Sequence, residues 1–144
     1  MSFMNAQHFL DTNVLVHAYD SSDPQKHACA QELLRQGLRH GDAAVSVQVF
    51  GEFFTVVTRR IAEPMSADEA RSIISTLSML WVQDIDLALV QRAIDAHQQY
   101  GLAYWDSLIV AAAERAGCAS LLSEDLNPGQ IYLGVRVRNP FTRP

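Results

Sequence analysis

Short apolar runs alternate along the chain with longer segments in which apolar residues recur at helical spacing. The short runs have the length of strands, and the longer segments have the period of amphipathic helices. This alternation is typical of a mostly parallel sheet whose strands are connected by helices. The expected strands cover residues 8–10, 43–47, 81–83, 119–122 and 135–138.

Capping signals predict where the helices begin and end. Asp23-Pro24 combines an N-cap with proline at the first helical position, and the segment from Ser66 to Glu69 has the S-x-x-E form of a capping box. Gly41 and Gly101 stand where helices should stop. The expected helices are a short one after Asp11-Thr12-Asn13 and longer ones over residues 24–38, 48–61, 67–80, 87–100 and 104–116.

Composition agrees with one folded α/β domain over residues 1–144. The chain is 49% hydrophobic and 19% charged, and no repeat or Pro/Gly/Ser-rich linker divides it. The longest apolar run, residues 108–113, is far shorter than the roughly 20 residues that span a bilayer. Residues 1–9 contain no Lys or Arg and no long apolar core. We therefore expect no membrane span, no secretory signal and a cytoplasmic location.

The sequence offers little for soft-metal chemistry or for a broad basic binding surface. Cys29 and Cys118 belong to no CxxC pattern, and the five histidines lack ligand spacing, so reduced structural thiols are expected. The net charge of -5 argues against nucleic-acid binding through many Lys and Arg contacts. A polyanionic partner would need metal ions or a few clustered arginines.

Two acids follow strands that should end at the same edge of the sheet. Asp11 comes directly after residues 8–10, and Asp125 follows residues 119–122 through Ser123 and Glu124. Open α/β sheets bind ligands beyond the carboxyl ends of their strands. Taken alone, Asp11 is better explained as an N-cap, and a Ser-x-Asp turn is common, whereas Glu124 is expected to face solvent.

Two further acids lie in otherwise apolar helical segments. Helical spacing puts Glu52 on one face with Val49 and Val56, and Asp106 on one face with Ile109 and Val110. A buried carboxylate needs a cation, an arginine or a raised pKa.

Each of these two acids has a simpler explanation. Glu52 could form a salt bridge with Arg59 or Arg60, and Asp106 could complement a helix dipole. If all four acids converge, oxygen-only ligands select Mg²⁺ or Mn²⁺, which favours phosphodiester hydrolysis.

These motifs together resemble the PIN domain family. They are Asp11-Thr12-Asn13-Val14-Leu15, Glu52 in an apolar helix, Tyr104-Trp105-Asp106-Ser107, Ser123-Glu124-Asp125-Leu126 and the ending from Gly134 to Phe141. More narrowly, the chain is similar to the VapC-type toxins of bacterial toxin-antitoxin pairs. The resemblance covers essentially the whole chain, with no departure at the four acidic positions.

The resemblance implies a PIN-like three-layer α/β/α sandwich with a mostly parallel five-stranded sheet. It implies a homodimer, a cognate antitoxin and Mg²⁺- or Mn²⁺-dependent cleavage of RNA. Its implied catalytic residues and metal ligands are Asp11, Glu52, Asp106 and Asp125, with Thr12, Asn13 and Ser123 in support. Arg59, Arg60, Arg136 and Arg138 are candidate RNA contacts, although a solvated face explains them equally well.

Two other classes of acidic-site protein fit the sequence less well. A receiver domain needs a lysine near its phosphorylated aspartate, and the only lysine is Lys26 in another predicted helix. Haloacid-dehalogenase-type phosphatases need Asp-x-Asp, which Asp11-Thr12-Asn13 lacks. A housekeeping PIN nuclease for RNA processing and a PIN fold kept as a non-catalytic interaction module remain open alternatives. The intact acids disfavour the module, and a neighbouring antitoxin gene would identify a toxin.

Overall fold

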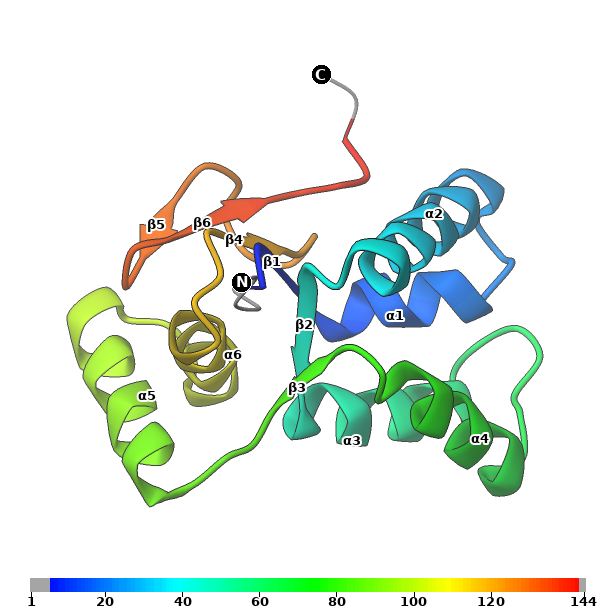
Figure 1. Cartoon of the computed structure of the whole chain (residues 1–144), viewed down its shortest axis with the longest axis horizontal. Coiled ribbons are helices and arrows are strands. Elements are labelled where there is room, and N and C mark those ends of the chain that lie inside the picture. Colours follow the sequence, from blue (N-terminus) through cyan, green and yellow to red (C-terminus); the bar gives the residue numbers. More distant parts are fainter. Residues whose placement is uncertain (1–5, 143–144) are drawn as a thin grey trace.

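A six-stranded sheet runs through the centre of the computed structural model, which describes residues 6–142 (Figure 1). The strand order is β3-β2-β1-β4-β6-β5. All neighbouring pairs are parallel except β5 and β6, which are antiparallel. The strands are β1 (His8–Leu10), β2 (Ala43–Ser46), β3 (Trp81–Gln83), β4 (Ser120–Leu122), β5 (Ile131–Tyr132) and β6 (Val135–Arg138).

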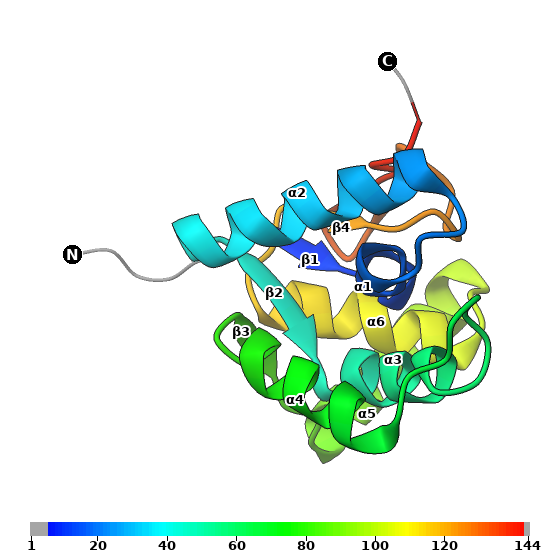
Figure 2. The same ribbon diagram turned by 90° about the vertical axis from the view of Figure 1, so that its right-hand side faces the viewer.

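Within residues 6–142, six helices cover the two faces of this sheet. They are α1 (Thr12–Tyr19), α2 (Pro24–His40), α3 (Val47–Val57), α4 (Ala67–Leu77), α5 (Leu87–Tyr100) and α6 (Tyr104–Arg115). Figure 2 shows α2 on one side of β1 and β2 and α6 on the other, so the expected three-layer α/β/α arrangement is confirmed. The segments outside residues 6–142 include part of the N-terminal stretch for which we expected no secretory signal.

The expected capping residues fix several helix ends. Asp23 accepts a hydrogen bond from the backbone of Lys26, with Pro24 at the start of α2. Ser66 caps α4 through the backbone of Glu69. Gly41 and Gly101 end α2 and α5 with φ values of 67° and 71°, in the left-handed region that favours glycine. The α3 helix ends at Val57, four residues before the predicted end, in a turn that includes Arg59 and Arg60.

The sixth strand corrects the expectation of a five-stranded sheet. Strand β5 has two residues, too few to show the alternation that identifies a strand in sequence. A turn at Leu133 and Gly134, with φ values of 51° and 80°, joins it to β6. Leucine is an unusual residue for that conformation, and its backbone N–H donates to the Tyr100 hydroxyl at 2.9 Å. The hairpin therefore depends on a contact with α5 that local sequence does not reveal.

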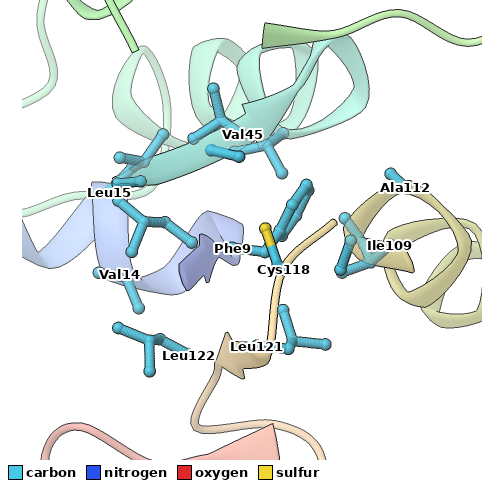
Figure 3. Close-up of a cluster of buried hydrophobic side chains, with 14 of the residues drawn as sticks. Phe9, Val14, Leu15, Val45, Ile109, Ala112, Cys118, Leu121 and Leu122 are labelled. Atoms are coloured by element: carbon cyan, nitrogen blue, oxygen red, sulfur yellow. The ribbon is translucent and has the colours of Figure 1, made fainter. Parts of the chain in front are cut away.

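The core lies between β1, β2 and β4 and the helices that cover them (Figure 3). Phe9, Val45 and Leu121 are fully buried there. On one face, Gly37 of α2 lies so close to β2 that an added methyl group would come within 2.7 Å of the Ala43 Cβ. Cys118 is a free thiol buried beside this core, and burial raises its pKa to about 12. In the described part of the chain, no helix combines the length and apolar character of a membrane span.

Strand register determines which residues leave the sheet together. Leu10 of β1 pairs with Leu122 of β4, so Asp11 and Ser123 are the next residues at the same edge. The Asp11 backbone N–H donates to the Leu122 carbonyl at 3.0 Å, which continues the pairing by one step. The carboxyl edge of the sheet therefore holds both segments that sequence analysis selected.

Candidate functional site

Asp11 is buried at this edge, with an exposed fraction of 7%. Its Oδ1 accepts a 2.7 Å hydrogen bond from the Thr12 backbone, and its Oδ2 accepts a 2.8 Å bond from the Ser123 hydroxyl. Asp11 is also the N-cap of α1, so the simpler role considered from sequence is present as well. Helix capping does not require such deep burial, because most N-caps lie at the surface.

Burial raises the pKa of Asp11 from 3.8 to about 6. The hydrogen bonds from Ser123 and Thr12 oppose this shift, whereas the charges of Asp125 and Glu52 add to it. Asp11 therefore lies in the negative field of two other predicted site residues. Keeping it ionised in the fold costs free energy unless a cation is nearby.

Glu52 faces the same region from α3. Its Oε1 accepts a 2.5 Å bond from the Thr12 hydroxyl, and its Oε2 accepts a 3.2 Å bond from Gln48, one helical turn earlier. Within residues 6–142, Glu52 forms no salt bridge with Arg59 or Arg60, so that alternative is not realised. Thr12 thus joins the Asp11 turn to the Glu52 carboxylate.

Asp106 lies in the first turn of α6 and is partly buried. Burial raises its pKa, and the charges of Asp125 and Glu52 raise it further. Gln48 Nε2 also donates to the carbonyl of Trp105 at 3.1 Å, so this amide ties α3 to the start of α6. Gln48 is not among the residues predicted from the sequence, in which its only signal is its position one turn before Glu52.

Asp125 is the most exposed of the four acids, and its neighbours hold it in place. Its backbone N–H donates to the Ser123 hydroxyl at 3.1 Å, and Asn13 donates to its Oδ2 at 2.9 Å. The structure therefore places Thr12, Asn13 and Ser123 in contact with the acids, as polar links between α1, α3 and the segment after β4.

A cleft of about 610 Å³ opens beside these residues. The residues that line it include Thr12, Asn13, Glu52 and Asp125. Arg60 also lines it, together with residues of α3. Arg59, Arg136 and Arg138, the other candidate arginines, are not among the described residues that line this cleft. Arg136 is on β6, where it donates to the Gly129 carbonyl at 3.3 Å, and Arg59 and Arg138 are exposed.

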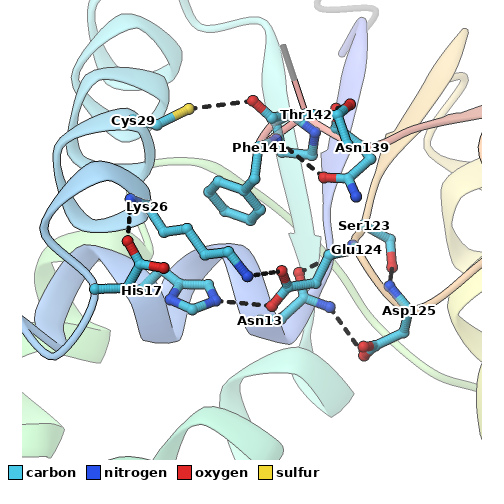
Figure 4. Close-up of polar contacts among 12 residues, drawn as sticks. Asn13, His17, Lys26, Cys29, Ser123, Glu124, Asp125, Asn139, Phe141 and Thr142 are labelled. Atoms are coloured by element: carbon cyan, nitrogen blue, oxygen red, sulfur yellow. Dashed lines mark hydrogen bonds and ion pairs between the residues drawn. The ribbon is translucent and has the colours of Figure 1, made fainter.

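Glu124 is only partly exposed and is ion-paired, which corrects the expectation from sequence that it faces solvent (Figure 4). Its carboxylate accepts from Lys26 Nζ and lies against His17 Nε2, both at 2.7 Å. Burial alone would raise the pKa of Glu124, but the hydrogen bonds from Lys26 and His17 outweigh it and lower the pKa below the ordinary value. This contact is not visible in the sequence, because Lys26 is 98 positions away from Glu124.

The donor set of the site fits a hard divalent cation. Within residues 6–142, Asp11, Glu52, Asp106 and Asp125 make no ion pair with a basic side chain. Gln48 Oε1, another oxygen, is buried without a hydrogen-bond partner in the described structure. Among the described residues, no group of three or more His, Cys, Asp or Glu side chains has the arrangement that would hold a metal ion. The oxygen chemistry and the unbalanced negative charge nevertheless match what hard divalent cations prefer.

The fold is a mostly parallel α/β sandwich in which Asp11 and Asp125 follow strands at the carboxyl edge of the sheet and Glu52 faces the same region from α3. The chain belongs to the PIN domain family, whose family model matches residues 8–132. No curated protein matches the chain significantly in sequence.

Solved structures with the same fold include toxin proteins. One is a toxin from Mycobacterium tuberculosis, VapC20, described as cleaving the sarcin-ricin loop. It is 20% identical, with a TM-score of 0.64 over 83% of this chain and 92% of that one.

Two further structures are complexes. A toxin-antitoxin complex from Klebsiella pneumoniae matches with 18% identity and a TM-score of 0.66 over 93% of this chain and 98% of that one. DNA-bound VapBC from Salmonella typhimurium gives 14% identity and the same TM-score and coverage. At these identities, the likeness establishes the fold alone.

Proposed function

We propose that this protein is a ribonuclease that depends on Mg²⁺ or Mn²⁺ and hydrolyses RNA phosphodiester bonds. One observation carries the proposal: Asp11 is buried among other acids at the carboxyl edge of a PIN fold, with no basic side chain paired to them in the described residues. Such charge is stabilised when a cation binds.

In this proposal, Asp11, Glu52, Asp106 and Asp125 hold the cation. Thr12 and Ser123 orient the Glu52 and Asp11 carboxylates through their hydroxyls, and Asn13 fixes Asp125. A divalent cation bound there would neutralise charge on the phosphate and assist hydrolysis. The chain itself needs no nucleophilic side chain for this reaction.

The cleft offers a place for RNA beside the acids. Arg60 lines it and can contact a backbone phosphate, so it is a stronger candidate than Arg59, Arg136 or Arg138. The shape of the cleft and of the loops around it would select the RNA, as is common for proteins that recognise folded or single-stranded RNA. The activity would take place in the cytoplasm, where its substrate is found.

We further propose that the protein is the toxin of a toxin-antitoxin pair, acts as a homodimer and is inhibited by a cognate antitoxin. This is supported by the fold shared with structures described as toxins and toxin-antitoxin complexes. A housekeeping nuclease for RNA processing would use the same acids and would lack an antitoxin gene beside it. Retention of all four acids disfavours a non-catalytic interaction module.

The test is RNA cleavage by the purified chain across a titration of Mg²⁺ and Mn²⁺, with and without a chelator. Cleavage should require the cation and should be abolished in Asp11→Asn and Asp106→Asn while circular dichroism shows that both variants fold. Asp84→Asn, an exposed acid outside the site, is the matched control and should cleave normally. Unchanged cleavage in both site variants would refute the assignment.

A further inference from the structure

Glu124 separates the two functional residues of its loop and points away from them. Ser123 and Asp125 face the acidic site, whereas the Glu124 carboxylate reaches back to α1 and α2, where it meets His17 and Lys26 (Figure 4). Each contact is 2.7 Å long, and the Glu124 side chain is only 21% exposed. One carboxylate thus joins the loop to two helices.

Phe141, near the C-terminus, covers this ion cluster. Its ring meets the His17 ring edge-on at 5.0 Å, and Lys26 Nζ lies 5.7 Å from its centroid. Two hydrogen bonds hold the segment that carries Phe141 (Figure 4). Cys29 Sγ donates to the Pro140 carbonyl at 3.3 Å, and the Phe141 backbone donates to Asn139 Oδ1 at 2.9 Å. We call Glu124, Lys26, His17 and Phe141 the Glu124 clamp.

The clamp acts on a segment without regular secondary structure. Residues 123–130 form the connection between β4 and β5, and Asp125 within it is exposed. Asn13 holds the other side of this segment, because its Oδ1 accepts from the Glu124 backbone at 3.4 Å while its Nδ2 donates to Asp125. An exposed carboxylate on such a segment has many accessible positions unless its neighbours restrict it.

We propose that the Glu124 clamp is a positioning device that holds Ser123 and Asp125 in the arrangement a divalent cation needs. This inference rests on the proposed function of the acidic site. Partly exposed ion pairs usually add little to global stability, so the clamp's main effect is on local geometry. Removal of a residue that orients a metal ligand typically lowers metal affinity by about 10- to 100-fold.

Mn²⁺ binding to the purified full chain, followed by electron paramagnetic resonance, tests the clamp without RNA. Glu124→Gln keeps the shape and removes the charge, and Lys26→Met removes the ammonium group while keeping its apolar stem. Lys26→Arg should rescue binding because it retains the positive charge beside Glu124 and Phe141. Glu114→Gln is the matched control, since it breaks the 2.9 Å pair with Arg92 in another part of the fold.

We expect Glu124→Gln and Lys26→Met to weaken Mn²⁺ binding by about 10-fold or more, with unfolding midpoints near that of the unmodified chain. Lys26→Arg and Glu114→Gln should bind within about twofold of it, a difference of at most about 0.4 kcal/mol. Saturating Mn²⁺ should restore RNA cleavage in Glu124→Gln.

Two results would overturn the clamp while leaving the proposed function intact. The first is unchanged Mn²⁺ affinity in both Glu124→Gln and Lys26→Met. The second is a loss of Mn²⁺ affinity in Glu114→Gln as large as the loss in those two variants. Absence of Mn²⁺ binding by the unmodified chain would instead contradict the proposed function, and the clamp with it. If Glu124→Gln fails to fold, Lys26→Met decides the matter alone, because Lys26 is partly exposed on α2.

Discussion

The hydroxyl of Ser123 donates a 2.8 Å hydrogen bond to Asp11 Oδ2, although the two residues are 112 positions apart in the chain. The Ser123 hydroxyl oxygen also accepts a hydrogen bond from the backbone N–H of Asp125 at 3.1 Å. A single buried hydroxyl thus fixes one candidate ligand and the backbone of another.

Ser123→Ala should weaken Mn²⁺ binding by about 10- to 100-fold, because Asp11 loses a donor and the Asp125 backbone loses its acceptor. Calorimetric titration of the metal-free variant measures the effect. Ser120→Ala is the matched control, since Ser120 is also buried, on the strand that Ser123 follows, but bonds His8 Nδ1 at 2.7 Å. Equal Mn²⁺ affinities for the Ser123→Ala and Ser120→Ala variants would show that the hydroxyl does not orient the site.

Asp11→Asn should stabilise the metal-free protein above pH 7. The folded chain binds the Asp11 proton more tightly than the unfolded chain, because burial raises its pKa to about 6 from 3.8. Protonated Asp11 therefore favours the folded state at low pH, and this contribution to the free energy of unfolding is lost as the pH rises from about 4 through 6. We expect the variant to gain about 1 to 3 kcal/mol at pH 7.5 and progressively less toward pH 4.

Urea denaturation in the presence of a chelator, at several pH values, measures this gain. Asp84→Asn, an exposed acid after β3, should show no such pH-dependent gain. If Asp11→Asn were destabilising at pH 7.5 without metal, the Asp11 charge would have to be balanced in the fold, contrary to the arrangement described above.

Arg60→Ala should weaken RNA binding more than it slows the chemical step, because Arg60 lines the cleft and is not hydrogen-bonded to the acids in the described structure. KM should rise while kcat changes little, and the salt dependence of binding should decrease by about one phosphate contact. Fluorescence anisotropy with a labelled RNA, at several salt concentrations, provides the measurement.

Arg39→Ala is the comparison for Arg60→Ala. Arg39 lies near the end of α2, close to the start of β2 and therefore at the opposite edge of the sheet from the acids. Removing it should leave both KM and the salt dependence unchanged. An equal effect of the two substitutions would indicate nonspecific attraction to the protein surface.

Gly37→Ala should destabilise the protein despite favouring the helix. Alanine improves helix propensity by about 1 kcal/mol, but crowding against packed side chains costs about 1 to 3 kcal/mol. The added Cβ would lie 2.7 Å from the Ala43 Cβ, so we expect the steric cost to exceed the gain. Gly51→Ala in α3, where nothing lies within 4 Å, should instead raise the melting temperature.

Thermal unfolding of both glycine variants distinguishes the two effects. Opposite shifts in melting temperature would agree with close contact between α2 and β2. A higher melting temperature for Gly37→Ala would mean that the helix can move away from the strand without loss.

Much of this fold could be predicted because its signals are local. Apolar periodicity gave the six helices and five of the strands, and Asp23, Ser66 and Gly101 marked their ends. The hairpin of β5 and β6 could not be predicted. The two residues of β5 are too few to show the alternation of a strand, and the turn at Leu133 depends on a contact with Tyr100. Local pattern cannot reveal a contact supplied by a distant helix.

The site shows the same division between local and distant information. Glu52 and Asp106 could be selected because a charged residue interrupts an apolar helical face. Gln48 and Glu124 could not be placed, because an amide or a carboxylate without a visible partner in the sequence is most often solvated. Their roles depend on Trp105 and Lys26, which are 57 and 98 positions away.

The pairing of Leu10 with Leu122 also determines where the chain can change length. Asp11 and Ser123 directly follow these two residues, and side chains alternate between the faces of a strand. Deleting one residue from β1 would turn Asp11 toward the opposite side of the sheet and separate it from Ser123. Insertions and deletions should therefore be tolerated in distant surface turns, whereas even a single-residue change in these two short strands would dismantle the site.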